Sequence, residues 1–132
     1  MTKQISLFLE NKTGRIGEVA KVLGENGINM QAFSMTETPD FGILRIVATD
    51  TERAVMVLND ANFAVILTDV VCVECADNPG SLAEVLDCIA GAGIDINYMY
   101  AFSVVDKARF VIKPSDIEKC EQVLKKTGCE IL

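Results

Sequence analysis

Two cysteines of this 132-residue sequence have a spacing that redox and zinc sites use. The segment Cys72-Val73-Glu74-Cys75 reads CxxC. A redox or zinc role needs a helix N-terminus or a tight turn at this motif, and zinc needs a second pair of ligands. The motif instead lies in an apolar run typical of a β-strand, where residues three apart point to opposite faces. We therefore predict that the five cysteines are thiols of the core: Cys72, Cys75, Cys88, Cys120 and Cys129.

Histidine is absent, which excludes several kinds of catalytic and metal site. Nucleophiles activated by His are impossible, and no side chain has an ordinary pKa near 7. The sequence has no P-loop and no dinucleotide fingerprint. Carboxylates such as Asp77 and Asp95 are suited to acid–base work, but nothing marks a substrate. The expectation is a protein that is not an enzyme and that holds no metal and no cofactor.

Charge and composition narrow the range of partners. Lys and Arg total 12 against 19 Asp and Glu, a net charge of −7. Nucleic acids and anionic membranes require a basic surface, so neither is an expected partner. Half of the residues are apolar, which is enough for a core, but no apolar run approaches the roughly 20 residues of a spanning helix. The first residues lack a signal-peptide pattern. We expect a soluble cytoplasmic protein.

Two glycines, Gly14 and Gly80, stand where an alternating apolar segment gives way to a helical pattern. Without a Cβ, the backbone there can approach a ligand closely. The following helix offers unpaired N–H groups and the positive end of its dipole, which suits a carboxylate. Pro79 suits the first helical position. The alternative is that these residues only form a tight turn and a cap.

The sequence repeats itself at a constant offset. Residues 11–19 align with 77–85 and residues 27–30 with 93–96, without a gap between the matches. The segments 44–47 and 108–111 match at a slightly shorter offset, which predicts hairpin loops of different length and places Arg45 and Arg109 at equivalent positions. An internal repeat indicates two copies of one unit. We predict domains at 1–69 and 70–132.

Each copy reads strand, helix, strand, strand, helix, strand. Residues 5–10 alternate with a period of two, whereas residues 16–23 carry apolar side chains at helical spacing. Thr49 and Ser115 each precede a Glu by three positions, the spacing of a capping box. The βαββαβ order predicts an α+β, ferredoxin-like fold: antiparallel sheets with the helices on one face, and the two units packed side by side.

The segment Asp77-Asn78-Pro79-Gly80-Ser81-Leu82-Ala83, followed by Gly93-Ile94-Asp95-Ile96-Asn97, resembles the ACT domain. The first copy resembles it at residues 10–17 and 27–30, so the resemblance covers essentially the whole chain. ACT domains are small regulatory modules that bind amino acids. The resemblance therefore implies a tandem ACT protein without a catalytic domain, and the first copy is also similar to small regulatory subunits of acetolactate synthase.

The resemblance also implies which residues hold a ligand. Amino-acid-binding members use a polar residue of the first loop and an Asn at the start of the second strand. Those positions are Asn11 and Asn29 in the first copy, and Asp77 and Asp95 in the second. Ionised Asp only accepts hydrogen bonds, so the second copy either holds an ammonium group or repels a carboxylate. The predicted ligand-binding residues are Asn11, Lys12, Thr13, Gly14, Arg15, Ile16, Asn29, Met30, Asp77, Asn78, Pro79, Gly80, Ser81, Leu82, Asp95 and Ile96.

A helix separates the loop from the second strand within one copy. Residues 14–26 extend roughly 18 Å at 1.5 Å per residue, so Asn11 and Asn29 cannot share one small ligand. Packing about a pseudo-two-fold axis would pair Asn11 with Asp95 and Asp77 with Asn29. We predict two non-equivalent sites at the interface between the copies. For Lys12 and Arg15, a solvent-exposed charge is the alternative to a role in the site.

The leading hypothesis is a non-catalytic regulatory protein that binds a free amino acid and transmits this to a partner, either a metabolic enzyme or a regulator. The alternative is a protein-interaction subunit, like the acetolactate synthase small subunit, whose ligand site is weak or vestigial. The acidic residues of the second copy support this alternative. An exposed sheet edge or helical face is also compatible with a homodimer.

Overall fold

The computed structural model describes residues 2–10 and 12–132. The chain divides into two compact units, Lys3–Thr68 and Asp69–Leu132, and Thr2 belongs with the second. We call them the N-terminal unit and the C-terminal unit. That they are separate domains with bounds 1–69 and 70–132 stays a prediction.

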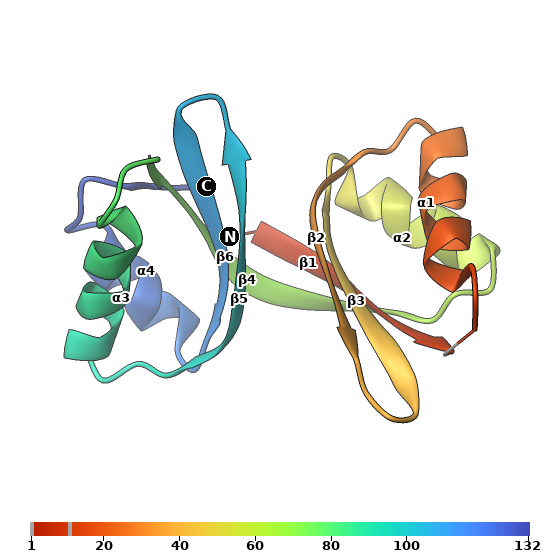
Figure 1. Cartoon of the computed structure of the whole chain (residues 1–132), viewed down its shortest axis with the longest axis horizontal. Coiled ribbons are helices and arrows are strands. Elements are labelled where there is room, and N and C mark those ends of the chain that lie inside the picture. Colours follow the sequence, from red (N-terminus) through yellow and green to blue (C-terminus); the bar gives the residue numbers. More distant parts are fainter. Residues whose placement is uncertain (1, 11) are drawn as a thin grey trace. The chain divides into compact units, whose positions relative to one another are not determined.

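The N-terminal unit has the strand order β2-β3-β1-β4, and its strand β4 continues into the C-terminal unit. Strand β3 pairs antiparallel with both β1 and β2. The two helices lie on one face of the sheet (Figure 1). The elements are β1 (Thr2–Glu10), α1 (Arg15–Glu25), β2 (Met30–Glu37), β3 (Phe41–Ala48), α2 (Thr51–Asp60) and β4 (Val65–Ala76).

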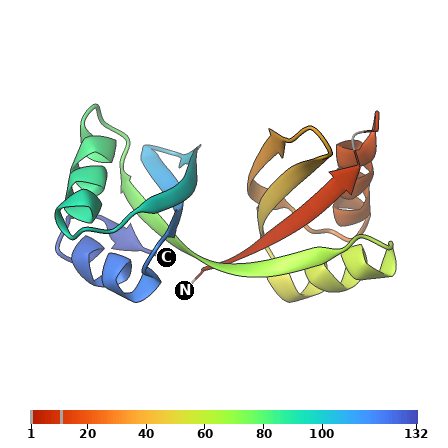
Figure 2. The ribbon, with the colours of Figure 1, turned by 90° about the horizontal axis from the view of Figure 1, so that it is seen from below.

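The C-terminal unit repeats this arrangement with the order β7-β4-β6-β5. Its three pairings are antiparallel, and α3 and α4 cover one face of its strands (Figure 2). The predicted α+β fold of two ferredoxin-like units is therefore confirmed. The further elements are α3 (Ser81–Gly91), β5 (Ile96–Val104), β6 (Lys107–Pro114), α4 (Ile117–Leu124) and β7 (Glu130–Ile131).

Each unit buries a core of its own between sheet and helices. In the N-terminal unit, alternate β1 residues such as Leu7 pack with Leu23 of α1 and Leu58 of α2. In the C-terminal unit, Val73 of β4 and Ile89 of α3 do the same. All five side chains are at most 1% exposed, and burying one aliphatic side chain contributes about 1.5–3 kcal/mol. The alternation in the strands and the apolar stripes of the helices thus position the loops between them.

The offset that aligns residue 11 with residue 77 continues through the second half of each unit, so the predicted shorter offset there is wrong. Ile5 pairs with Ile46, and Val71 pairs with Ile112, so both partners of the pair recur at the same offset. The longer strand β5 compensates for the shorter turn before β6, which keeps the offset constant. Arg45 and Arg109 are therefore not equivalent: Arg45 pairs with Ser6, whereas Arg109 pairs with Glu74.

The second helix of each unit is capped by an aspartate, so the predicted capping boxes are wrong. The Asp50 carboxylate accepts a hydrogen bond from Arg53 N at 3.2 Å, and the Asp116 carboxylate accepts one from Lys119 N at 3.0 Å. Thr49 and Ser115 lie one residue too early to cap these helices, and they bind the start of the second strand instead.

No helix within the described residues is long and apolar enough to cross a membrane.

Candidate ligand-binding site

Gly14 and Gly80, which each lie between a strand and a helix, adopt the same backbone conformation. Gly14 has φ +86° and Gly80 has φ +94°, the left-handed region that side chains rarely adopt. A Cβ added at either glycine would meet nothing within 4 Å, so φ, not space, requires glycine. Each glycine is the N-cap residue of its helix, and α3 begins at Ser81. Pro79 therefore precedes the cap, and its predicted place at the first helical position is wrong.

The N-termini of α1 and α3, which follow these glycines, have no side-chain cap. The first N–H groups of a helix have no acceptor within it, and the helix dipole adds positive potential there. A carboxylate is the kind of group that these two positions can bind.

In the C-terminal unit the open helix end borders a cavity of about 500 Å³. The loop before α3 forms one wall, and the β5–β6 hairpin forms the other. The two walls are joined by a hydrogen bond of 3.4 Å that Asp77 N donates to Asp106 O. Six predicted residues line this cavity together, namely Asp77, Asn78, Pro79, Gly80, Ser81 and Leu82.

The corresponding cavity of the N-terminal unit is smaller, about 320 Å³. Four predicted residues line it, Lys12, Gly14, Arg15 and Ile16, and Thr13 lies between them without lining it. Asn11 lies outside the described residues. The placement of residues 12–16 therefore matches that of the second copy.

Charged side chains line the N-terminal cavity, and both of its basic residues form ion pairs with glutamates. Lys12 Nζ lies 2.8 Å from the Glu10 carboxylate, and this hydrogen bond, with the charge of Lys12, lowers the pKa of Glu10. The Arg15 guanidinium pairs with Glu18 and stacks 4.7 Å over the Phe63 ring. Lys12 is exposed, as its alternative predicted, but Arg15 is half-buried by these contacts. Among the residues that the structure describes, no basic side chain lines the C-terminal cavity.

The remaining predicted residues lie at the other end of the first helix of each unit. Asn29 N donates to Thr49 Oγ1 at 3.1 Å, and Thr49 N donates back to Asn29 O at 3.0 Å. Asp95 and Ser115 form the same pair of bonds at 3.0 and 2.8 Å. Met30 and Ile96 begin the strands that follow. The structure thus does not bring these residues to the loop of their own unit, and their pairing across the copies stays a prediction.

Residues of the β5–β6 and β2–β3 hairpins complete the two cavities. The C-terminal cavity is lined by Ala101, Phe102, Ser103, Ala108 and Phe110. Met35 and Glu37 line the N-terminal cavity. The topology itself is the signal: β3 and β6 run antiparallel to the strand before the loop, so each hairpin turn lies at the loop end of the sheet.

The cysteines differ from the prediction in one respect. Cys75 and Cys129 are joined by a disulfide, so they are not free thiols. Cys72, Cys88 and Cys120 are free, and the two ends of the CxxC motif point to opposite faces of β4 as predicted. Within the described residues no group of three or more acidic or Cys side chains is placed to hold a metal ion.

Comparison with solved structures finds the same architecture. Protein BT0572 from Bacteroides thetaiotaomicron is 45% identical, with 99% of this chain and 91% of that chain covered and a TM-score of 0.93. The ligand-free regulatory subunit of aspartate kinase from Thermus thermophilus is 18% identical, with 93% and 87% covered and a TM-score of 0.71. The corresponding subunit from Thermus flavus is 19% identical, with 93% and 88% covered and a TM-score of 0.64. The two aspartate kinase subunits show a shared fold alone.

No curated protein matches the chain. The model of the ACT domain pair family matches residues 1–130, nearly the whole length. This match confirms the resemblance seen in the two loop motifs. The chain belongs to the ACT domain pair family.

Proposed function

We propose that the chain is a non-catalytic regulatory protein that binds a free amino acid in the cavity of the C-terminal unit. One observation carries this proposal: a cavity of about 500 Å³ lies at the uncapped N-terminus of α3, beside the carboxylate of Asp77. Ligand sites of proteins commonly enclose about 300–1,000 Å³. The size and chemistry of this cavity suit a small zwitterion.

The lining supplies a partner for each part of an α-amino acid. The α-carboxylate would accept hydrogen bonds from the first N–H groups of α3, where the helix dipole favours negative charge. The α-ammonium would donate to the Asp77 carboxylate. The ligand side chain would face Ala101, Phe102 and Phe110, which favours a small or apolar amino acid. Of the two alternatives for the acidic residue of this loop, the geometry favours binding of an ammonium group.

The N-terminal cavity is proposed as the weaker site. It is smaller, Met35 forms part of its wall, and its two basic residues, Lys12 and Arg15, already pair with glutamates. A ligand there would have to compete with the Lys12–Glu10 pair. The two copies are therefore proposed to bind amino acids with different affinity.

The proposed partner is an enzyme or regulator of amino-acid metabolism. The support is an analogy of fold, since two of the similar structures are regulatory subunits of aspartate kinase. A ligand would change the contact with such a partner only by its differential affinity for the two states of the protein.

Thermal unfolding with each common amino acid tests the proposal. A ligand bound only by the folded state raises Tm with concentration, and calorimetry then gives its Kd. We expect one amino acid, or a small related set, to raise Tm. A flat screen would contradict the proposal and would favour the interaction subunit with a vestigial site.

Matched variants locate the site. Asp77→Asn removes the charge proposed to hold the ammonium, so we expect Kd to rise at least about tenfold. Asp87→Asn removes an exposed carboxylate from the adjoining helix outside the cavity lining, and it should leave Kd within about twofold. Equal effects of the two variants would place the ligand elsewhere. Asn29→Ala tests the predicted pairing of Asn29 with Asp77, since a shared site requires both to weaken the same binding event.

A further inference from the structure

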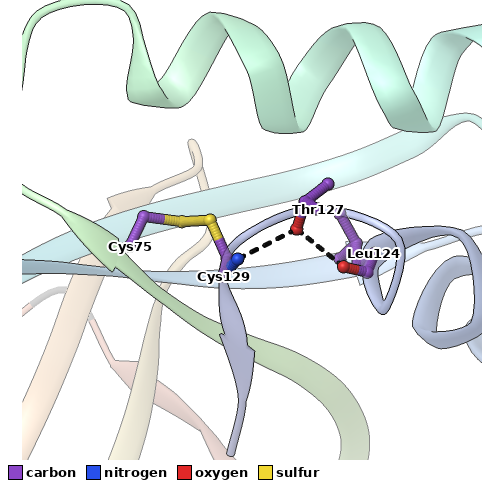
Figure 3. The surroundings of a disulfide bond; sticks show 4 residues. All are labelled: Cys75, Leu124, Thr127 and Cys129. Carbon is purple, nitrogen blue, oxygen red and sulfur yellow. Dashed lines mark hydrogen bonds between the residues drawn. A yellow bond between two sulfur atoms is a disulfide. The ribbon is translucent and has the colours of Figure 1, made fainter.

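A disulfide fastens the last strand of the C-terminal unit (Figure 3). Cys75 lies near the end of β4, and Cys129 directly precedes β7; their Cα atoms are 4.7 Å apart and 54 residues apart in sequence. Strand β7 has only two residues, and Leu132 N adds one hydrogen bond of 2.9 Å to Cys72 O. The disulfide therefore adds a covalent tie to a strand that few backbone hydrogen bonds hold.

The other copy shows that this corner of the fold does not require a disulfide. At the offset of the repeat, Leu9 corresponds to Cys75 and Phe63 corresponds to Cys129. Leu9 and Phe63 are 1% and 6% exposed and belong to the core of the N-terminal unit. Apolar packing therefore closes the same corner in one copy. The cysteine pair adds a chemical property that packing does not have.

The disulfide borders a second cavity of the C-terminal unit. Both cysteines line this space of about 330 Å³, together with Asn78, Ser81 and Glu84. Cys75 is 3% exposed, whereas Cys129 is half-buried. Exposed Gly128 also lines the cavity and leaves the approach to Cys129 free of a side chain. Cys129 is thus the more exposed of the two cysteines.

We propose that the Cys75–Cys129 disulfide is an exchange site for low-molecular-weight thiols that enter through this cavity. The thiolate of a small thiol attacks Sγ of Cys129, the S–S bond breaks, and the Cys75 sulfur leaves as a thiolate that takes a proton from water. A second small thiolate attacks the small-thiol sulfur of the mixed disulfide and releases Cys129, which also takes a proton. Two small thiols are oxidised to one disulfide, and the two cysteines gain two electrons.

Exchange at this site would act on the neighbouring loop. The cavity shares Ala76, Asn78, Pro79 and Ser81 with the larger cavity of the candidate ligand site. Opening the bond removes the covalent tie between β7 and the end of β4, directly before the shared loop. The exchange site itself does not depend on the proposed binding of an amino acid.

Counting thiols on the wild-type chain tests the proposal. Protein purified without reductant and alkylated after denaturation should take three labels, because Cys72, Cys88 and Cys120 are free. Native protein incubated with reduced glutathione before denaturation should take all five. Five labels before any reductant would overturn the proposal, because no disulfide then forms. Three labels after native incubation would also overturn it, because the bond of the folded protein then does not exchange with the small thiol.

Two variants locate the point of attack. Cys75→Ser treated with glutathione disulfide should gain one glutathione on the peptide that contains Cys129. Cys129→Ser should gain none at Cys75, which is buried; Cys88→Ser in both backgrounds removes the other half-buried thiol. Equal modification at Cys75 would overturn entry through the cavity. Circular dichroism checks that each variant is folded, and if one is not, the wild-type count decides alone.

Discussion

In the N-terminal unit, the Met35 side chain lies where a side chain at residue 42 would stand, and residue 42 is Gly. The Cε atom of Met35 would clash with a Cβ built on Gly42, so the absence of that Cβ makes room for the methionine. The equivalent residues of the C-terminal unit are Ala101 and Ala108. Both line the larger cavity. The smaller cavity thus has the long side chain of Met35 in its wall, whereas the larger cavity has two alanines at the equivalent positions.

Exchanging these side chains should exchange the binding properties of the two copies. We expect Met35→Ala to open the N-terminal cavity and to add a second binding event in calorimetry with the amino acid that binds the wild type. Ala101→Met combined with Ala108→Gly, which makes the same room for the methionine, should fill the C-terminal cavity and raise Kd at least about tenfold, since a filled site loses its ligand contacts. Ala32→Ser on the same edge strand as Met35 serves as a control, and it should not change the stoichiometry. An unchanged stoichiometry in Met35→Ala would contradict the proposed role of Met35.

The aspartate caps should contribute measurable stability. Asp50→Ala or Asp116→Ala removes an acceptor for a first-turn N–H group, and we expect each to lower the free energy of unfolding by about 1 kcal/mol in urea denaturation. Glu52→Gln should have little effect, because no capping box forms. Asp60→Ala is a further control: it removes a negative charge from the C-terminal end of α2, where the helix dipole disfavours it. A large loss of stability in Glu52→Gln would instead indicate that the capping box forms.

Loss of the disulfide should destabilise the chain. Closing a 54-residue separation reduces the entropy of the unfolded chain, so we expect Cys129→Ser to lower the free energy of unfolding by about 2–4 kcal/mol under non-reducing conditions. Reductant should lower the free energy of unfolding of the wild type by a similar amount and should leave that of Cys129→Ser unchanged. Cys88→Ser is the control, because its thiol is not part of the bond. A variant that still responds to reductant would contradict this assignment.

Alkaline pH should destabilise the fold through Cys120. Burial, followed by the neighbouring charge of Glu121, raises the pKa of this thiol from about 9 to about 11. The unfolded chain therefore loses the proton first, so the stability linked to Cys120 is complete below about pH 9 and is lost as the pH rises toward 11. We expect Tm of the wild type to fall more steeply over this range than Tm of Cys120→Ala. Parallel slopes would show that the thiol does not contribute.

The fold was predictable because its signals are local and occur twice. The alternation around Leu7, the stripe through Leu23 and the positive-φ glycines each depend on a few neighbouring residues, and the second copy repeats them at a constant offset. The predicted equivalence of Arg45 and Arg109 was wrong because it was based on similar residue types, whereas strand register sets which positions are equivalent. Thr49 and Asp50 are adjacent potential caps, and only backbone geometry distinguishes between them.

The part of the candidate site that is contiguous in sequence was predictable, whereas most of the residues that tertiary structure brings to it were not. Residues 77–82 are contiguous, so their motif predicted them as a group. Ala101 and Met35 reach the cavities through strand pairing, and the Cys75–Cys129 bond joins residues 54 apart. Such contacts depend on tertiary closure, which no local pattern encodes.

Because paired positions of the two copies recur at one offset, each residue of the β1–β3 ladder has a counterpart in the β4–β6 ladder. A segment of one copy can therefore be grafted onto the matching positions of the other without a change of strand register. Such chimaeras would present the loop of either copy on the scaffold of the other.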